Sequence, residues 1–289
     1  MTVTAVYDCV VEPTNRLDGV TLNDVRWRGA KLSHAVFRSA TLLEADLSGA
    51  DLSGATLTSV DFARAVLSDA DLSGSTIRET QFAFAWMAGT SLIEAHIEDT
   101  SFRKAQLRQS RFHSARLTNC KFSGAVLNEA AFHHARLVDC DFSASELVGA
   151  QFHGTQMSMC RFSAINGMGA TLSKAHIKFC DFSKAELQGA KFGNADLGGS
   201  LFTGANAPEA DFRDSNLTGT DFTGANLRNA RFSGARLFAA NLSGTDLTGA
   251  RDFTALQLSQ ARTDPTTILP NGSTGPFLRN SGAERARRF

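Results

Sequence analysis

A period of five residues runs through most of this chain and restricts its fold more than any other feature. Every fifth position from 17 to 247 is Leu, Phe, Ile, Met or Trp, with two exceptions, Gly167 and Ala207. The position two residues earlier, from 20 to 245, is Ala, Ser, Thr, Cys or Val, except at Ile165. Each repeat therefore has one large apolar centre and one small residue.

This period fits neither an α-helix nor a β-strand. On a helix, five steps of roughly 100° place successive centres about 140° apart around the axis. On a strand, an odd period points successive centres to opposite faces of the sheet. The centres can share one interior only if the chain turns within each repeat, and stacked turns then bury a continuous core.

Longer recurrences predict how many repeats close one turn. Phe occupies every second centre over much of the chain, and Cys and His recur every twenty residues. We therefore predict coils of twenty residues with four sides. The four cysteines that recur every twenty residues occupy the position of the small residue, two before the centre, which we call the small slot. We therefore interpret them as packing residues rather than a metal or redox site. The predicted core includes Phe102, Phe112, Phe122, Phe132, Phe142, Phe152, Phe162 and Phe182, with Cys120, Cys140, Cys160 and Cys180.

The repeats resemble those of the pentapeptide repeat family, whose motif is A(D/N)Lxx. The motif is nearly literal in ADLSGADLSGATL (45–57), TDFTGANLRNA (220–230) and ANLSGTDLTGA (240–250). The resemblance covers about residues 17–250. It implies an all-β solenoid, a right-handed quadrilateral β-helix of about twelve coils, with the centre and the small residue inside.

Both ends of the chain depart from the five-residue frame, and an open β-edge needs a cap. Residues 1–16 are predicted to form an N-terminal cap, and residues 251–289 a C-terminal cap with a mobile tail. After Ala250 the frame slips by one residue, so that Phe253 carries the aromatic side chain. A short helix is predicted from Thr254 to about Ala261, with Gln257 placed for a capping box.

Charge is segregated along the chain, although the net charge is zero. Residues 1–100 hold 7 basic and 14 acidic side chains, whereas residues 101–180 hold 10 basic and 4 acidic ones and five of the seven His. This basic belt is either a solvated surface or a contact surface for an acidic partner. Its candidate contact residues are Arg103, Lys104, Arg108, Arg111, His113, Arg116, His133, His134, Arg136 and His153.

Outward apolar residues form a second candidate surface. Phe84 and Trp86 lie close together, and Met159 and Phe179 share one column at the twenty-residue period. Single exposed apolar residues are common on protein surfaces, whereas clustered ones indicate an interface with a partner. Packing against a neighbouring side chain or an irregular coil is the alternative explanation.

We expect no enzyme activity, cofactor or metal site. The chain has no GxxxxGK[ST], HExxH or GxSxG motif, and a filled coil offers no cleft for catalytic groups. The five cysteines include no CxxC pair. There is no signal peptide and no apolar run of membrane-spanning length, so a cytoplasmic protein that does not enter the membrane is expected.

Three functions remain open. The first is a scaffold or adaptor that binds a protein partner, as a monomer or an end-to-end homodimer. The second is implied by the resemblance: bacterial members of the family mimic DNA, bind DNA gyrase or another topoisomerase, and protect it from quinolones or natural toxins. Acidic residues in the first hundred positions fit this role, and the basic belt does not. The third is direct nucleic-acid binding through the belt.

Overall fold

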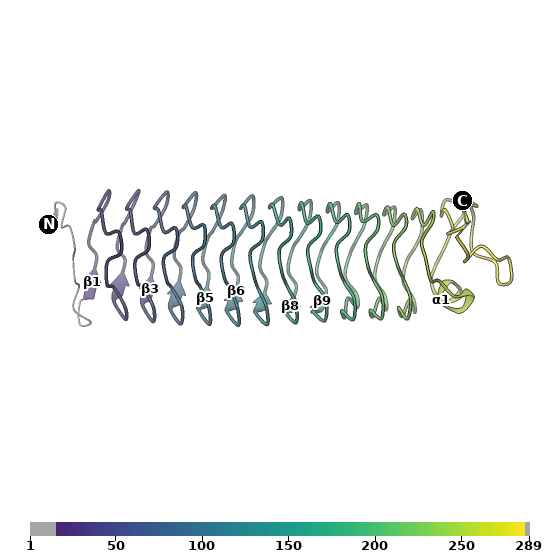
Figure 1. The fold of residues 1–289 in the computed structure, drawn as a ribbon, viewed down its shortest axis with the longest axis horizontal. Helices are drawn as coiled ribbons and strands as arrows, with labels where there is room; N and C mark the ends of the chain where they lie inside the picture. The colour runs from purple at the N-terminus through teal and green to yellow at the C-terminus, as the bar shows by residue number, and fades with distance from the viewer. Residues whose placement is uncertain (1–15, 287–289) are drawn as a thin grey trace. The chain divides into compact units, whose positions relative to one another are not determined.

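The computed structural model describes residues 16–286, which wind into parallel coils with a repeat of twenty residues (Figure 1). They form two units, residues 16–146 and residues 147–286. The predicted N-terminal cap, apart from Arg16, lies outside the described residues. The parallel β-solenoid expected from the sequence is confirmed in both units.

One side of the coil carries the regular strands. In the first unit each strand pairs in parallel with the strand twenty residues later, as in Arg116↔Arg136, and β8 and β9 pair in the same way in the second unit. Each strand buries its central residue from β2 onward. The strands are β1 (Arg16–Asp18), β2 (Val36–Arg38), β3 (Thr56–Thr58), β4 (Thr76–Arg78), β5 (His96–Glu98), β6 (Arg116–Thr118), β7 (Arg136–Val138), β8 (Gln156–Ser158) and β9 (His176–Lys178).

The other three sides are joined by isolated parallel bridges, such as Asp51↔Asp71 in the first unit. After β9 the strand-bearing side also continues with single bridges, such as Asp196↔Asn216. Within the described residues nine coils therefore carry a regular strand, and the coils after β9 are joined by single bridges on all sides.

A tight turn separates most neighbouring sides. In the repeat at Leu47, the amide of Ala50 donates to the Leu47 carbonyl at 3.0 Å, and Gly49 between them has φ of 64°. A hydrogen bond from i+3 to i with positive φ at i+2 is a type II turn, which favours Gly at that position. The frequent Ser-Gly and Thr-Gly pairs after the centres thus produce the corners of the coil.

Stacked aromatic rings fill the interior of each unit. Phe102 and Phe122, on successive coils, stack with ring centroids 4.7 Å apart. Phe112, on another side, meets Phe122 edge-on at 6.0 Å. In the second unit Phe182 and Phe202 stack at 4.8 Å. Offset stacks and edge-to-face pairs are favourable geometries, so a Phe at every second centre builds a continuous core.

Residues 165 and 167 both depart from the repeat pattern, and the extra volume of one side chain fills the space left by the other. Gly167 leaves the centre slot empty, while Ile165 places a large side chain in the preceding small slot. A Cβ at Gly167 would lie 3.0 Å from Leu187 Cδ2 and 3.2 Å from Ile165 Cδ1, so these two side chains occupy the missing volume. The coil continues without a bulge.

The C-terminal end is closed by the short helix α1 (Ala255–Gln260), as the sequence predicted (Figure 1). Thr254 and Gln257 form the capping box. Phe253 enters the interior and stacks on Phe232 with centroids 4.4 Å apart. The buried Gln257 side chain donates from Nε2 to the carbonyls of Phe232 (2.8 Å) and Ala235 (2.9 Å), so it satisfies backbone groups at the edge of the last coil.

Core and surface positions are expected to respond differently to truncation. Phe122→Ala should lower the free energy of unfolding by about 3–5 kcal/mol, because it removes a fully buried ring from the aromatic stack. Arg116→Ala, on the exposed strand face, should change it by no more than about 0.5 kcal/mol. Urea unfolding of both variants measures the difference, and similar losses would contradict the assignment of the interior.

The C-terminal cap should weaken in acid through Asp264. Hydrogen bonds from the Thr266 hydroxyl, and then from the amides of Thr266 and Gly244, hold the pKa of Asp264 at about 2. This value lies below the unfolded value of about 3.9, so the contribution is complete above pH about 4 and is lost as the pH falls towards 2.

Thermal unfolding between pH 5 and pH 2 tests this dependence against the matched variant Asp264→Asn, which cannot titrate at this position. The stability advantage of the wild type should shrink as the pH falls. A constant difference across the range would show that Asp264 is not responsible.

Candidate functional site

The interior is filled, so the candidate sites lie on the outward slots. The predicted core residues, including all eight Phe centres and the four cysteines, are buried. Among residues 16–286 no group of three or more His, Cys, Asp and Glu side chains is arranged to hold a metal ion. In this part of the chain no helix is long and apolar enough to cross a membrane.

An aromatic pair at one corner of the first unit is the most distinctive outward feature. Phe84 is 50% exposed and Trp86 is 58% exposed, although both are large and apolar. Trp86 forms parallel bridges with Val66 on one neighbouring coil and Gln106 on the other. Phe84 sits in the corner slot with φ of 60°, where the turn directs its side chain outward.

Three cations lie on the next coil, and one of them contacts this aromatic pair. Lys104 places Nζ 5.5 Å from the centre of the Phe84 ring, within the range of a cation–π contact. Arg103 and Arg108 belong to the same coil, which is held to that of Phe84 by backbone bonds such as Phe84 N to Arg103 O at 3.0 Å. We call Phe84, Trp86, Arg103, Lys104 and Arg108 the aromatic corner.

The remaining belt residues of the first unit lie on other sides of the coil. Arg116 and Arg136 stack directly opposite each other in β6 and β7, with no carboxylate partner among the described residues. Arg111 and the His residues occupy a different side. The basic belt therefore encircles the coil instead of forming one surface.

His113 adds little positive charge to the belt. The His113 and His133 rings lie 5.0 Å apart, on successive coils. Burial lowers the pKa of His113, and the nearby His133, Arg111 and His134 lower it further. His113 is therefore neutral near pH 7. His153 belongs to the second unit.

Met159 and Phe179 occupy successive coils of the second unit, and Phe179 is 69% exposed. Its ring leans over the corner residue Gly199, where a Cβ would lie 2.9 Å from a ring carbon. Gly199 has φ of 69°, so both the backbone and the ring above it favour glycine. Local packing therefore explains part of this apolar column.

Several acidic side chains of the first hundred residues have internal roles. Asp51, Asp61 and Asp71 each accept the backbone amide two residues ahead, at 2.9–3.1 Å. This side-chain turn fixes the backbone beside the centre. The Ser53 hydroxyl bond lowers the pKa of Asp51, which keeps the carboxylate ionised. The acidity that suggested DNA mimicry thus contributes to forming the coil.

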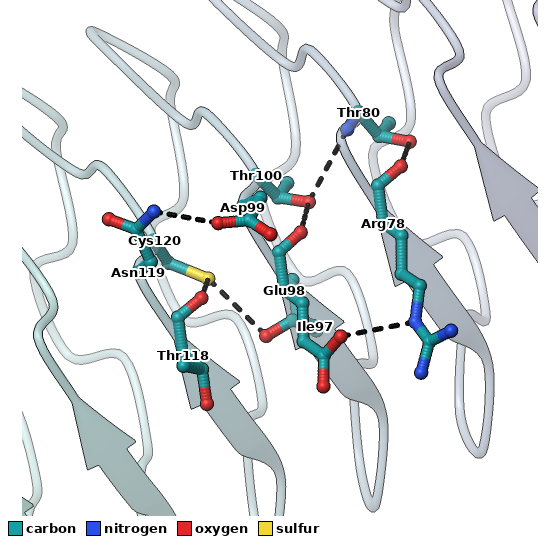
Figure 2. Close-up of polar contacts among 9 residues, drawn as sticks. All are labelled: Arg78, Thr80, Ile97, Glu98, Asp99, Thr100, Thr118, Asn119 and Cys120. Atoms are coloured by element: carbon teal, nitrogen blue, oxygen red, sulfur yellow. Dashed lines mark hydrogen bonds and ion pairs between the residues drawn. The ribbon is translucent and has the colours of Figure 1, made fainter.

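Cys and Thr side chains that recur every twenty residues on the strand-bearing side form hydrogen bonds with backbone carbonyls, and we interpret them as structural. On the strand-bearing side, the chain stays extended past the centre, and small-slot side chains bind carbonyls there (Figure 2). Cys120 Sγ lies 3.6 Å from Ile97 O on the preceding coil and 3.5 Å from Thr118 O. Thr100 Oγ1 donates to Glu98 O at 2.8 Å and accepts from Thr80 N at 3.5 Å.

The same view shows how outward side chains link neighbouring coils (Figure 2). Arg78 Nε lies 3.1 Å from Glu98 Oε2, and Asn119 Nδ2 donates to Asp99 Oδ1 at 2.6 Å. Both pairs join residues that are twenty positions apart and therefore lie in the same column of outward slots. Exposed pairs of this kind contribute about 0–1 kcal/mol, so the interior determines stability.

Together these features define a parallel β-solenoid with a filled core and variable outward slots. The family model described as "Pentapeptide repeat region" matches residues 55–132 and 110–192. The model "Pentapeptide repeats (8 copies)" matches residues 16–54, 180–219 and 215–251. The chain belongs to the pentapeptide repeat family, as the sequence motif indicated.

Solved structures of the family resemble this chain. HetL, a pentapeptide repeat protein involved in heterocyst differentiation regulation in the cyanobacterium Nostoc sp., is 25% identical, with 81% of this chain and 91% of HetL covered and a TM-score of 0.40. QnrB1, a plasmid-mediated fluoroquinolone resistance protein, is 18% identical, with 58% and 89% covered and a TM-score of 0.31. A pentapeptide repeat protein from the Arabidopsis thaliana thylakoid lumen is 22% identical, with 54% and 81% covered and a TM-score of 0.17. No curated protein matches the chain by sequence.

The buried cysteines are expected to resist modification in the folded protein. Cys120, Cys140, Cys160 and Cys180 are buried, and a side-chain hydrogen bond with Cys160, together with burial, raises the pKa of the Cys180 thiol. Iodoacetamide should leave all four unmodified in native buffer and alkylate them in urea, because only the exposed thiolate reacts. Peptide mass spectrometry measures each site. Rapid native alkylation of any of the four would contradict the packing role.

Proposed function

We propose that this protein is a non-enzymatic scaffold that binds an acidic protein partner through the aromatic corner of its first unit. The observation that supports this proposal is the exposed pair Phe84 and Trp86, flanked by Arg103, Lys104 and Arg108 on the adjoining coil. The outward slots of the coil can hold many residue types, and nothing in its packing requires two exposed aromatic rings there.

The chemistry of the corner suits a protein interface. Trp, Tyr and Arg are enriched among the residues that dominate binding energy, and they combine large apolar area with directed polar contacts. The three cations would attract an acidic surface and accelerate its association. The stacked coils hold both groups on a rigid support, which lowers the entropic cost of binding.

The gyrase or topoisomerase alternative would use the acidic slots of the first unit. Their carboxylates engage local amides, and Asp46 in addition binds Arg28 and Ser48. Direct nucleic-acid binding would use the belt, whose cations point to several sides of the coil. Each alternative gives a distinct outcome in the experiment below.

A photo-crosslinking residue at position 86 should capture the partner in the native host, whereas the same residue at position 238 serves as a control. Phe238 is also exposed, at 63%, but belongs to the second unit. Mass spectrometry then identifies what is attached. An acidic protein supports the proposal; covalent capture of gyrase, another topoisomerase or nucleic acid supports an alternative.

Binding of the purified partner then tests the aromatic corner directly. Trp86→Ser should weaken affinity at least about thirtyfold, as expected for a central aromatic residue. Arg108→Glu should slow association and reduce its dependence on salt. Phe238→Ser is the matched control and should bind like the wild type. Unchanged affinity in both corner variants, with folding intact, would refute the proposed surface.

A further inference from the structure

The coil that carries Phe84 and Trp86 is apolar on its outer surface over two of its sides. Residues 82–89 form the longest run in the chain without a polar side chain, and five of them occupy outward slots. Phe84 and Trp86 project from this row, whereas Ala83 and Ala88 beside them are too small to cover the rings. Both rings are therefore open to contact from outside the coil.

A row of cations lies directly beside this apolar row, on the next coil. Backbone hydrogen bonds hold the two rows in register, from Phe84 N to Arg103 O at 3.0 Å and from Gly89 N to Arg108 O at 2.9 Å. Neighbouring coils are separated by about 4.8 Å, as in a β-sheet. Arg103, Lys104 and Arg108 are exposed, and no ion pair involves them among residues 16–286. Apolar area and unpaired positive charge thus lie side by side.

The two sides that carry these rows hold no carboxylate over three successive coils. Residues 81–88, 101–108 and 121–128 occupy the same eight slots, and together they contain four cations and no acidic side chain. The carboxylates between residues 88 and 101 belong to the other sides of the coil. Because no local acid neutralises the cations, charge complementarity favours acidic side chains in whatever binds here.

On the preceding coil the charges are already engaged. Arg64 lies 3.3 Å from a Glu44 carboxylate oxygen, and Asp61 accepts the backbone amide of Ala63 at 2.9 Å. The Asp69 carboxylate extends over Gly89, at the far end of the apolar row. The surface is therefore polarised along the solenoid axis, and positive charge is available only on the side of residues 101–108.

The size of this surface fits a short segment better than a folded domain. Three coils span about 14 Å along the axis, and two sides of five residues span at most about 33 Å around the coil. The resulting area, at most about 460 Å², is little more than half of the roughly 800 Å² that each partner contributes to a standard protein–protein interface. An extended peptide of about ten residues is long enough to cross the surface.

We propose that the partner binds the aromatic corner through a short acidic peptide segment, in which a large apolar residue lies two or three positions from a pair of carboxylates. This inference rests on the proposed function and specifies the form of the partner. The apolar side chain packs against Trp86, and the carboxylates pair with Arg103 and Arg108. Residues of an extended segment are about 3.3 Å apart, so two or three positions cover the distance from the apolar row to the cations.

Selection from a phage-displayed library of random twelve-residue peptides that lack tryptophan tests this form without knowledge of the partner. The full chain is immobilised, and the library is first depleted on the double variant Trp86→Ser with Arg108→Glu. The enriched peptides should share a large apolar residue with at least two Asp or Glu residues two or three positions away. Enrichment of peptides without acidic residues, or no enrichment over the double variant, would overturn the proposal.

Trp86 fluorescence then measures the affinity of a synthetic copy of an enriched peptide. The chain has two tryptophans, and Trp27 is only 6% exposed, so a change on titration reports Trp86. Replacing the acidic residues of the peptide by their amides should weaken binding at least about tenfold, and Arg108→Glu should have a similar effect. Arg136→Glu, an exposed arginine on the strand-bearing side of the same unit, is the matched control and should leave the affinity unchanged.

This inference and the proposed function can fail separately. If the captured partner loses affinity with Trp86→Ser but the enriched peptide does not compete with it, the partner uses a folded surface and only this inference is wrong. If the affinity of the captured partner is insensitive to Trp86→Ser, the proposed function itself is wrong. Equal weakening of the peptide by Arg136→Glu and Arg108→Glu would indicate nonspecific charge attraction and would also refute the inference.

Discussion

Backbone hydrogen bonding between residues about twenty positions apart is the constraint on which the rest of this structure depends. Amides and carbonyls of one coil bind those of the next on every side, as in Leu47 N to Val66 O at 2.7 Å. Because the register is fixed, each outward slot lies beside the equivalent slot of the neighbouring coil. Aromatic stacking, the cysteine column and the paired arginines are all consequences of this repetition.

Much of the fold could be predicted from the sequence, because the five-residue period records the shape of the interior directly. The Phe centres, the small slots, the frame slip at Phe253 and the capping box of Thr254 and Gln257 were all readable from residue type and spacing. Each of these features is determined by residues that are close together in the sequence or that repeat at a fixed spacing. The compensation between Ile165 and Gly167 was visible only as two exceptions to the pattern, since the sequence does not show which side chain fills which volume.

The candidate sites were less predictable for a physical reason. The aromatic pair Phe84 and Trp86 stood out in the sequence, and the predicted twenty-residue coil assigns residues to sides, but neither charge nor spacing shows which outward side chains contact each other. The contact of Lys104 with the Phe84 ring, for example, could not be read from residue type and spacing. The path of the C-terminal loop around Pro270 and Asn271 was not foreseen, because no periodicity describes it.

The Gln257 side chain also determines how copies of this protein can associate. A solenoid whose last coil presents free carbonyls can associate head to tail, because a second copy can form hydrogen bonds with that exposed edge. Each added copy then exposes an equivalent edge for the next one. Gln257 Nε2 occupies two of those carbonyls, on Phe232 and Ala235, with a single side chain. The cap backbone covers the rest of this edge, since the carbonyls of Gln260, Arg262, Ile268 and Pro270 accept the amides of Ala239, Leu242, Leu247 and Gly249. The helix and the segment after it thus leave little of the ladder open for a second copy to extend.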